Sequence, residues 1–178
     1  RDIGVTGVQT CALPICAGSI TLGSGTLTAG GDATSTTFSG VISETGGFTK
    51  AGAGILTLTG SNTFTGTLTI SAGTVSVGSG GTTGWIDATT VSNSGSITFN
   101  RSNSTTFSGV VSGTGSLTKD GTGTLTISGA NTYTGTTTIT AGTLALGASG
   151  VLSDSTAVTV TGTLSLGAYS EQVGSIAG

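Results

Sequence analysis

Side chains that could do chemistry are few in this chain of 178 residues, and they stand far apart in the sequence. Paired carboxylates can act as general acid and base on a glycosidic bond, and clustered carboxylates can bind calcium. The seven carboxylates are Asp2, Asp32, Glu44, Asp87, Asp120, Asp154 and Glu171. Histidine is absent, which excludes Ser-His-Asp and Cys-His catalysis and histidine metal sites. We therefore predict no catalytic, cofactor-binding or metal-binding residues, and no enzymatic activity.

The first sixteen residues differ in character from the rest and hold the one proline and both cysteines, Cys11 and Cys16. Residues 5–15, VTGVQTCALPI, resemble the in-frame translation of a short-read sequencing adapter. We therefore expect residues 1–16 to be an adapter-derived artefact. The alternative is a short-range disulfide or a cysteine metal site, but two thiols without histidine are too few ligands for zinc.

Charge and hydropathy exclude several classes of protein. Four basic residues against seven acidic ones give a net charge of −3, so the chain has no basic surface for phosphates and we expect no nucleic-acid partner. Apolar residues make up 34% of the chain, too many for a flexible linker. No apolar run approaches the roughly 18 residues of a membrane-spanning helix.

Short β-strands are the elements that the sequence predicts. Threonine is abundant and favours extended backbone, and glycines at frequent intervals mark turns. Apolar residues alternate in pairs, which is strand periodicity. These pairs are Ile20/Leu22, Leu56/Leu58, Val75/Val77, Ile97/Phe99, Leu125/Ile127, Leu144/Leu146, Val158/Val160 and Leu164/Leu166.

An internal repeat organises the chain from residue 17 to residue 178. Residues 35–78 and 104–147 lie 69 positions apart and are identical at 28 of 44 aligned positions. The trace of a partial third unit, GTLSLG at 162–167, follows and extends toward residue 178. One such short strand cannot bury enough apolar area to be stable, so the units must stack. The prediction is an all-β solenoid in which each 69-residue unit forms about three turns of twenty-odd residues.

Three motif elements recur in both units: G-x-LT, NT-aromatic-TG and AGT-apolar-x-apolar-G. Residues 53–78 and 121–147 carry them and resemble the autotransporter-associated β-strand repeat, also called the passenger-associated transport repeat. The resemblance implies a right-handed parallel β-helix in the passenger of a Gram-negative type V secreted protein. It also implies export through the protein's own C-terminal outer-membrane β-barrel, and a location at the cell surface or in the medium.

The function that follows is a structural, non-catalytic stalk segment that supports export, folding and display of the passenger. The alternative is an adhesin rod that binds host or neighbouring-cell ligands, for which exposed ladders of threonine, asparagine and aromatic residues would be suited. A third hypothesis, a β-helical polysaccharide lyase or hydrolase, requires acids that meet in a cleft.

Several side chains recur at equivalent repeat positions and are interpreted structurally. We expect the lysines to disfavour edge pairing at turns, the asparagines to accept turn geometry or stack, and the aromatics and Trp85 to pack. The recurring pairs are Lys50 with Lys119, Asn62 with Asn131, Phe38 with Phe107, and Phe64 with Tyr133.

Overall fold

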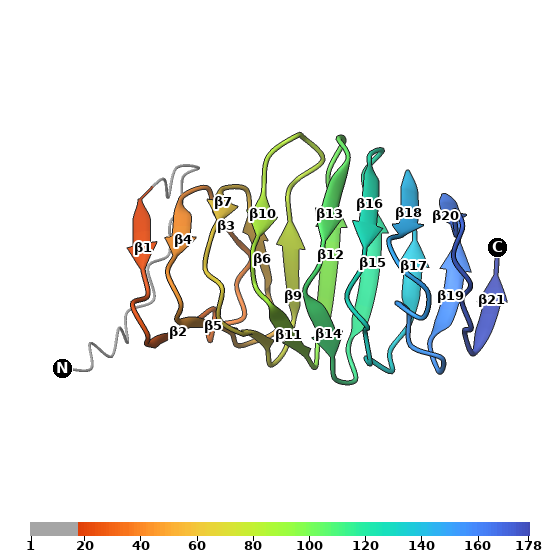
Figure 1. The fold of residues 1–178 in the computed structure, drawn as a ribbon. Coiled ribbons are helices and arrows are strands. Elements are labelled where there is room, and N and C mark those ends of the chain that lie inside the picture. Colours follow the sequence, from red (N-terminus) through yellow and green to blue (C-terminus); the bar gives the residue numbers. More distant parts are fainter. Residues whose placement is uncertain (1–17) are drawn as a thin grey trace.

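The computed structural model describes residues 18–178, which form an elongated stack of short β-strands (Figure 1). Every strand pairing is parallel. Within this part of the chain there is no helix with the length and hydropathy needed to cross a bilayer. The predicted all-β parallel solenoid is confirmed. The expected artefact, residues 1–16 with both cysteines and Asp2, lies outside the described residues.

The strands follow one another around three faces of the stack, which we call the first, second and third face. The first face holds the sheets β1-β4, β7-β10 and β13-β16-β18-β20, with strands β1 (Ser19–Thr21), β4 (Val41–Ser43), β7 (Ser61–Asn62), β10 (Trp85–Ile86), β13 (Thr105–Phe107), β16 (Thr124–Ile127), β18 (Thr143–Leu146) and β20 (Thr163–Ser165). The second face is one five-stranded sheet of β2 (Thr26–Ala29), β5 (Gly47–Lys50), β8 (Leu68–Ile70), β11 (Thr90–Asn93) and β14 (Val110–Ser112). The third face is one eight-stranded sheet of β3 (Thr36–Phe38), β6 (Ile55–Leu58), β9 (Thr74–Val77), β12 (Ser96–Asn100), β15 (Ser116–Asp120), β17 (Thr137–Ile139), β19 (Ala157–Val160) and β21 (Ser175–Ala177).

Each turn contributes one strand to the third face, so its eight strands correspond to eight turns. Ser96 pairs with Ser116, 20 residues further along the chain, which is the length of one turn at this point. At about 4.8 Å per strand spacing, eight turns make a rod roughly 40 Å long.

The core is a continuous apolar column inside the three faces. Strand residues alternate between buried and partly exposed, so one side chain in two points inward. Val75, Ile97 and Leu117 occupy paired positions on three successive strands, and all three are 0% exposed. Burying a side chain of this size contributes about 1.5–3 kcal/mol relative to exposure, so stacked turns stabilise one another.

Glycine fills the corners because turns approach one another there too closely for a side chain. A Cβ added to Gly46 would lie 2.1 Å from the carbonyl oxygen of Gly25, and one added to Gly66 would lie 2.2 Å from that of Gly46. These distances are far below van der Waals contact. The high glycine content therefore follows from the stacking of corners.

The sequence repeat and the structural turn do not coincide. Adding 69 residues carries β3 of the third face to β13 of the first, and β4 of the first face to β14 of the second. Likewise β5 of the second face corresponds to β15 of the third. The expectation of about three turns per unit is therefore refined: a unit spans three turns and about a third of another, and its two copies lie one face apart.

Candidate functional site

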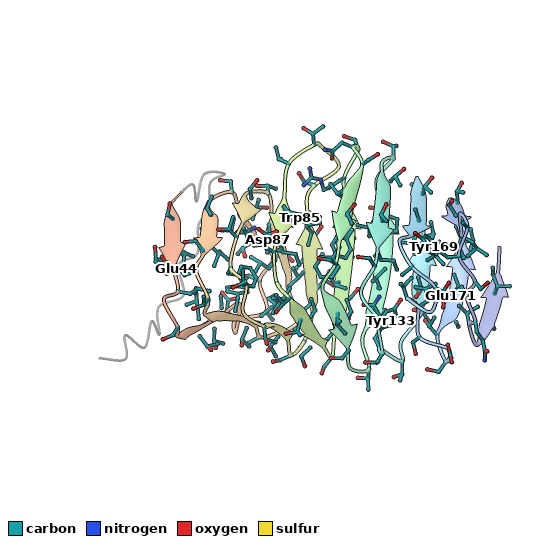
Figure 2. All side chains as sticks on the ribbon, viewed as in Figure 1. Glu44, Trp85, Asp87, Tyr133, Tyr169 and Glu171 are labelled. Carbon is teal, nitrogen blue, oxygen red and sulfur yellow. The ribbon has the colours of Figure 1, made fainter. Side chains whose placement is uncertain are left out.

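The described carboxylates lie apart and several serve the backbone or a neighbouring side chain. Asp32 accepts hydrogen bonds from the Thr34 amide at 3.2 Å and from its hydroxyl at 3.0 Å. Asp87 accepts one from the indole N–H of Trp85 at 2.6 Å. Within residues 18–178, no three side chains of the histidine, cysteine or carboxylate type lie close enough to hold a metal ion. Figure 2 labels Glu44, Asp87 and Glu171 at separate places along the rod.

Lys50 and Lys119 are buried, with 1% and 2% of their surface exposed, contrary to the expectation of turn lysines that guard an edge. The Lys119 ammonium donates to the carbonyls of Asp120 and Gly121, both at 2.8 Å, and of Ala141 at 3.2 Å. Burial lowers the pKa of Lys119, and the neighbouring Asp120 partly opposes that effect. The lysines thus bind the otherwise unpaired carbonyls of a bend from inside the rod.

Asn62 and Asn131 are also interior residues, and each replaces a missing backbone link between turns. The Asn62 Oδ1 accepts from the Ile42 amide at 3.0 Å, while its Nδ2 donates to the Trp85 carbonyl at 2.9 Å. Ile42 lies one turn before Asn62 and Trp85 one turn after it. Asn131 repeats this arrangement with the Val111 amide at 2.8 Å and the Val151 carbonyl at 2.6 Å.

Glu171 continues the same series on the second face at the C-terminal end of the rod. Its Oε2 accepts from the amides of Val151 at 2.9 Å and Leu152 at 3.3 Å, as the asparagine oxygens accept from the preceding turn. Its Oε1 is buried and has no hydrogen-bond partner among the described residues. In Asn131 the corresponding atom is the nitrogen that binds the following turn.

The aromatic residues pack inside or against the core, as the sequence predicted. Phe64, Tyr133 and Phe107 are at most 2% exposed, and Phe38 is partly buried. Trp85 is half-buried and meets the ring of Phe107 edge-on, with centroids 6.2 Å apart. The aromatics and asparagines of the repeat therefore form no exposed ladder for a ligand.

A buried hydroxyl cluster distinguishes the second unit from the first, and the sequence did not single it out. Tyr133 replaces Phe64 of the first unit, and Thr137 replaces Leu68. The Tyr133 and Thr137 hydroxyls lie 2.5 Å apart, and Thr137 bonds to Thr156 at 3.1 Å. The paired change from apolar to hydroxyl residues was the signal that could have revealed this cluster.

Hydroxyls form a continuous, partly exposed row along the third face. The register pairs its members strand by strand, and they are Thr37, Thr57, Ser76, Thr98, Thr118, Thr138 and Thr159. We call this set the hydroxyl row. Neighbours along it are one strand spacing apart, about 4.8 Å. All members are partly or fully exposed.

The hydroxyl row is uncharged and its threonine hydroxyls are available to a ligand. Only Ser76 bonds to another described group, the Gly78 carbonyl at 2.9 Å. The threonine hydroxyls make no hydrogen bond within residues 18–178. Such a surface can form repeated neutral hydrogen bonds. It is a candidate binding surface.

Fold and surface together define a parallel β-solenoid built from a repeated unit, with an apolar core and a hydroxyl-lined face. Residues 48–77 and 117–146 match the family described as the passenger-associated-transport-repeat. The chain therefore contains two copies of this autotransporter passenger repeat, and the resemblance deduced from its motifs is confirmed.

A curated relative supports the same conclusion. The protein named adhesin BmaC autotransporter, from Brucella suis biovar 1 (strain 1330), is 48% identical over 77 residues. That match covers 43% of this chain and 2% of the relative, so the chain spans only a small part of the relative's length. No solved structure matches the chain.

Proposed function

We propose that this chain is a structural, non-catalytic stalk segment of a bacterial autotransporter passenger, supporting its export, folding and display. The observation that carries the proposal is that both passenger repeats fold into stacked turns of one rod. Residues 48–77 supply strands β5 to β9, and residues 117–146 supply β15 to β18. Each turn that forms offers a strand edge and an apolar surface to the next, so turns can order one after another outside the cell.

The partner in this proposal is the protein's own C-terminal outer-membrane β-barrel, through which the passenger would pass. The location is the bacterial cell surface or the medium. A folded rod is wider than an extended chain, so folding outside the cell would oppose return of the chain through the barrel.

A display experiment tests the stalk proposal. Residues 18–178 are placed between the signal peptide and the barrel of an autotransporter, and surface exposure is measured by antibody labelling of intact cells. We expect efficient display, and reduced display when Val75→Asp and Leu117→Asp disrupt the core. Equal display of the disrupted chain would contradict a role for folding in export.

A second function, adhesion, is favoured by the hydroxyl row and by the adhesin name of the relative. We propose that the row binds a neutral, hydroxyl-rich ligand, namely a repeating glycan on a host or neighbouring cell. Its threonines offer unpaired hydroxyls at regular spacing without charge, which complements a neutral polymer rather than an ionic one.

Isosteric substitutions test the adhesion proposal. Changing Thr98, Thr118 and Thr138 together to Val removes hydroxyls but preserves side-chain shape and strand preference. We expect this triple variant to lose binding to glycans or cells. The matched control changes a row on the second face, with Thr28, Thr49 and Thr69 each made Val. Equal binding by both triple variants and the unmodified chain would exclude the hydroxyl row.

Incubation with the glycans used in the binding assay tests the non-catalytic part of the proposal. Prolonged incubation with polysaccharides should release no new reducing ends and no unsaturated products. Cleavage that depends on one of the described acids would instead favour a β-helical lyase or hydrolase.

A further inference from the structure

A second row of hydroxyls runs beside the hydroxyl row for part of the third face. Its members stand two positions before four consecutive members of that row, so they lie on the same side of the sheet. They are Thr74, Ser96, Ser116 and Thr136, beside Ser76, Thr98, Thr118 and Thr138. We call these eight residues the hydroxyl array, and all of them are partly or fully exposed.

The register sets the length of the hydroxyl array. On the turn before Thr74 the equivalent position is Ile55, and on the turn after Thr136 it is Ala157. Neither of these side chains carries a hydroxyl. The third face therefore offers two hydroxyls per turn on four consecutive turns.

The hydroxyls of the second row can bind a ligand. Those of Thr74 and Thr136 make no hydrogen bond within residues 18–178. The Ser96 and Ser116 hydroxyls bond to each other at 3.1 Å, which leaves one O–H and several lone pairs for another molecule. Neighbouring positions are about 4.8 Å apart along the rod and about 6.6 Å apart along a strand.

A carboxylate at the edge of the array disfavours anionic ligands. Asp120 follows Thr118 by two residues on β15, so it lies on the same side of the sheet, and it is partly exposed. The chain as a whole also carries a net charge of −3. Electrostatic complementarity therefore favours a neutral ligand on the array.

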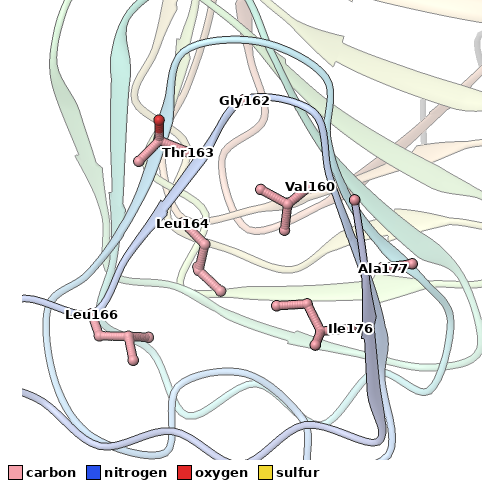
Figure 3. A pocket seen from close by; sticks show the side chains of 8 residues that line it. Val160, Gly162, Thr163, Leu164, Leu166, Ile176 and Ala177 are labelled. Atoms are coloured by element: carbon pink, nitrogen blue, oxygen red, sulfur yellow. The ribbon is translucent and has the colours of Figure 1, made fainter.

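The open hollow at the C-terminal end of the rod is a surface of another kind (Figure 3). Its walls include Val160, Leu164 and Ile176, which are inward residues of β19, β20 and β21. Among the side chains that line the hollow, only Thr163 carries a hydroxyl. A hydroxyl-rich chain is therefore matched by the array and not by this hollow.

We propose that the hydroxyl array binds an unbranched, neutral, β-1,4-linked glycan that lies along the rod with one sugar on each of the four turns. This inference rests on the adhesion proposal and names the class of its ligand. A β-1,4-linked chain forms a straight ribbon with hydroxyls along both edges, and each sugar advances it by slightly more than one strand spacing. The match therefore holds over a few turns, and the array offers four.

Calorimetric titration of the unmodified chain with β-1,4-linked glucose oligomers of two to six sugars tests the proposal. Each sugar up to the fourth should raise the affinity roughly two- to tenfold, because it adds hydrogen bonds of ordinary net strength. The fifth and sixth sugars should add little. An α-1,4-linked chain coils, so its glucose oligomers should bind at least about tenfold more weakly because fewer of their hydroxyls meet the array.

Two variants change the array in opposite directions. Ala157→Ser extends it by one turn and leaves its eight residues intact, so the affinity should level off at five sugars instead of four. Ser96→Ala combined with Ser116→Ala removes the middle of the second row and should weaken binding of the four-sugar oligomer by about tenfold.

The matched control removes a bonded hydroxyl pair elsewhere on the rod. The Thr67 and Thr90 hydroxyls lie 2.9 Å apart on neighbouring turns at the second face. Thr67→Val combined with Thr90→Val should bind the oligomers as the unmodified chain does. Circular dichroism of each variant verifies that it is folded.

The outcomes separate this inference from the adhesion proposal on which it rests. Equal affinity for α- and β-linked oligomers would overturn the inference and leave adhesion standing. An affinity that keeps rising beyond four sugars, or full binding by the folded Ser96→Ala, Ser116→Ala variant, would do the same. An unchanged levelling length in folded Ala157→Ser would also overturn it. Binding to no glycan at all would overturn both proposals.

Discussion

Asn131 shows how one side chain can substitute for a strand in the ladder between turns. Its amide bonds the Val111 N–H on one side and the Val151 carbonyl on the other, both in buried surroundings. Replacing it with alanine would leave both groups without partners, which costs about 1–3 kcal/mol for each. We expect Asn131→Ala to lower the free energy of unfolding by at least about 2 kcal/mol in urea titrations.

A matched control for Asn131→Ala is Asn103→Ala. Asn103 is partly exposed and accepts a hydrogen bond from the Arg101 side chain at 3.0 Å, so water can replace it. Its removal should change the free energy of unfolding by less than about 1 kcal/mol. Similar losses for both variants would contradict the role assigned to Asn131.

Gly66 is expected to tolerate no side chain because of close contacts. Its φ angle is not positive, so the backbone conformation alone would allow another residue. An alanine Cβ would lie 2.2 Å from the Gly46 carbonyl oxygen and force the two turns apart. We predict that Gly66→Ala lowers the thermal midpoint by several degrees, because steric overlap of this kind costs about 1–3 kcal/mol or more. Gly31→Ala, where a Cβ meets nothing within 4 Å, should leave the midpoint nearly unchanged.

Tyr133 makes the rod sensitive to alkaline pH. Burial raises the pKa of Tyr133 to about 12, with the Glu171 charge adding to the rise and the bond to Thr137 opposing it. A raised pKa means that folding favours the neutral phenol. Its stabilising contribution is therefore complete below the ordinary tyrosine pKa of about 10 and is lost as the pH rises toward about 12.

The expected loss of stability from Tyr133 across that interval is roughly 2–3 kcal/mol. Tyr133→Phe should reduce the loss, because phenylalanine occupies the equivalent position 64 and Thr137 retains its bond to Thr156. Tyr169→Phe, at a residue that is 42% exposed, should not. Unfolding curves at several alkaline pH values measure the difference, and identical pH profiles for Tyr133→Phe and the unmodified chain would refute the assignment.

At the scale of elements, the turn is the unit that can be removed. Deleting residues 96–115 joins Gly95 to Ser116, which pairs with Ser96 and occupies the same position on the third face one turn later. The remaining strands keep their order and the core stays continuous, so the shortened chain should retain its β-sheet circular dichroism and a cooperative thermal transition.

A deletion of half that length serves as the control for the turn deletion. Removing residues 96–105 would delete β12 of the third face. The chain would then run from β11 on the second face directly to the rest of β13, which belongs to the first face. We expect that chain to aggregate or to lose its cooperative transition. Equal behaviour of the two deletions would show that the turn is not the structural unit.

Much of this architecture could be predicted from the sequence. The alternating pair Val75/Val77 marked a strand, and both residues are 0% exposed on β9. The spacing of the units indicated stacking, and the glycines were expected at turns, whereas the close approach that excludes a Cβ there is seen only in the structure. The interior lysines and asparagines could not be placed, because a polar residue beside a turn has the same local pattern whether it faces solvent or unpaired carbonyls inside.

The candidate binding surface could be predicted only in part. Threonine was recognised as a ladder-forming residue, but the row on the third face depends on register, which joins residues one turn apart. Turn lengths vary, as the Ser76 to Thr98 and Thr98 to Thr118 steps show, so equal spacing in sequence would misalign the row. The placement of the two units on different faces could not be predicted either. Sequence identity shows that two segments are equivalent, but not how far one is rotated about the rod axis relative to the other.

At the scale of the whole molecule, the offset between repeat and turn places equivalent positions of the two units on different faces of the rod. A surface position of one unit recurs a third of the way around the axis and about 16 Å further along, at about 4.8 Å per turn. Equivalent surface positions of successive units would therefore follow a helical path around the rod. A partner that recognises the repeat could then meet the two copies on neighbouring faces of the rod, and so could reach one of them from either of two sides.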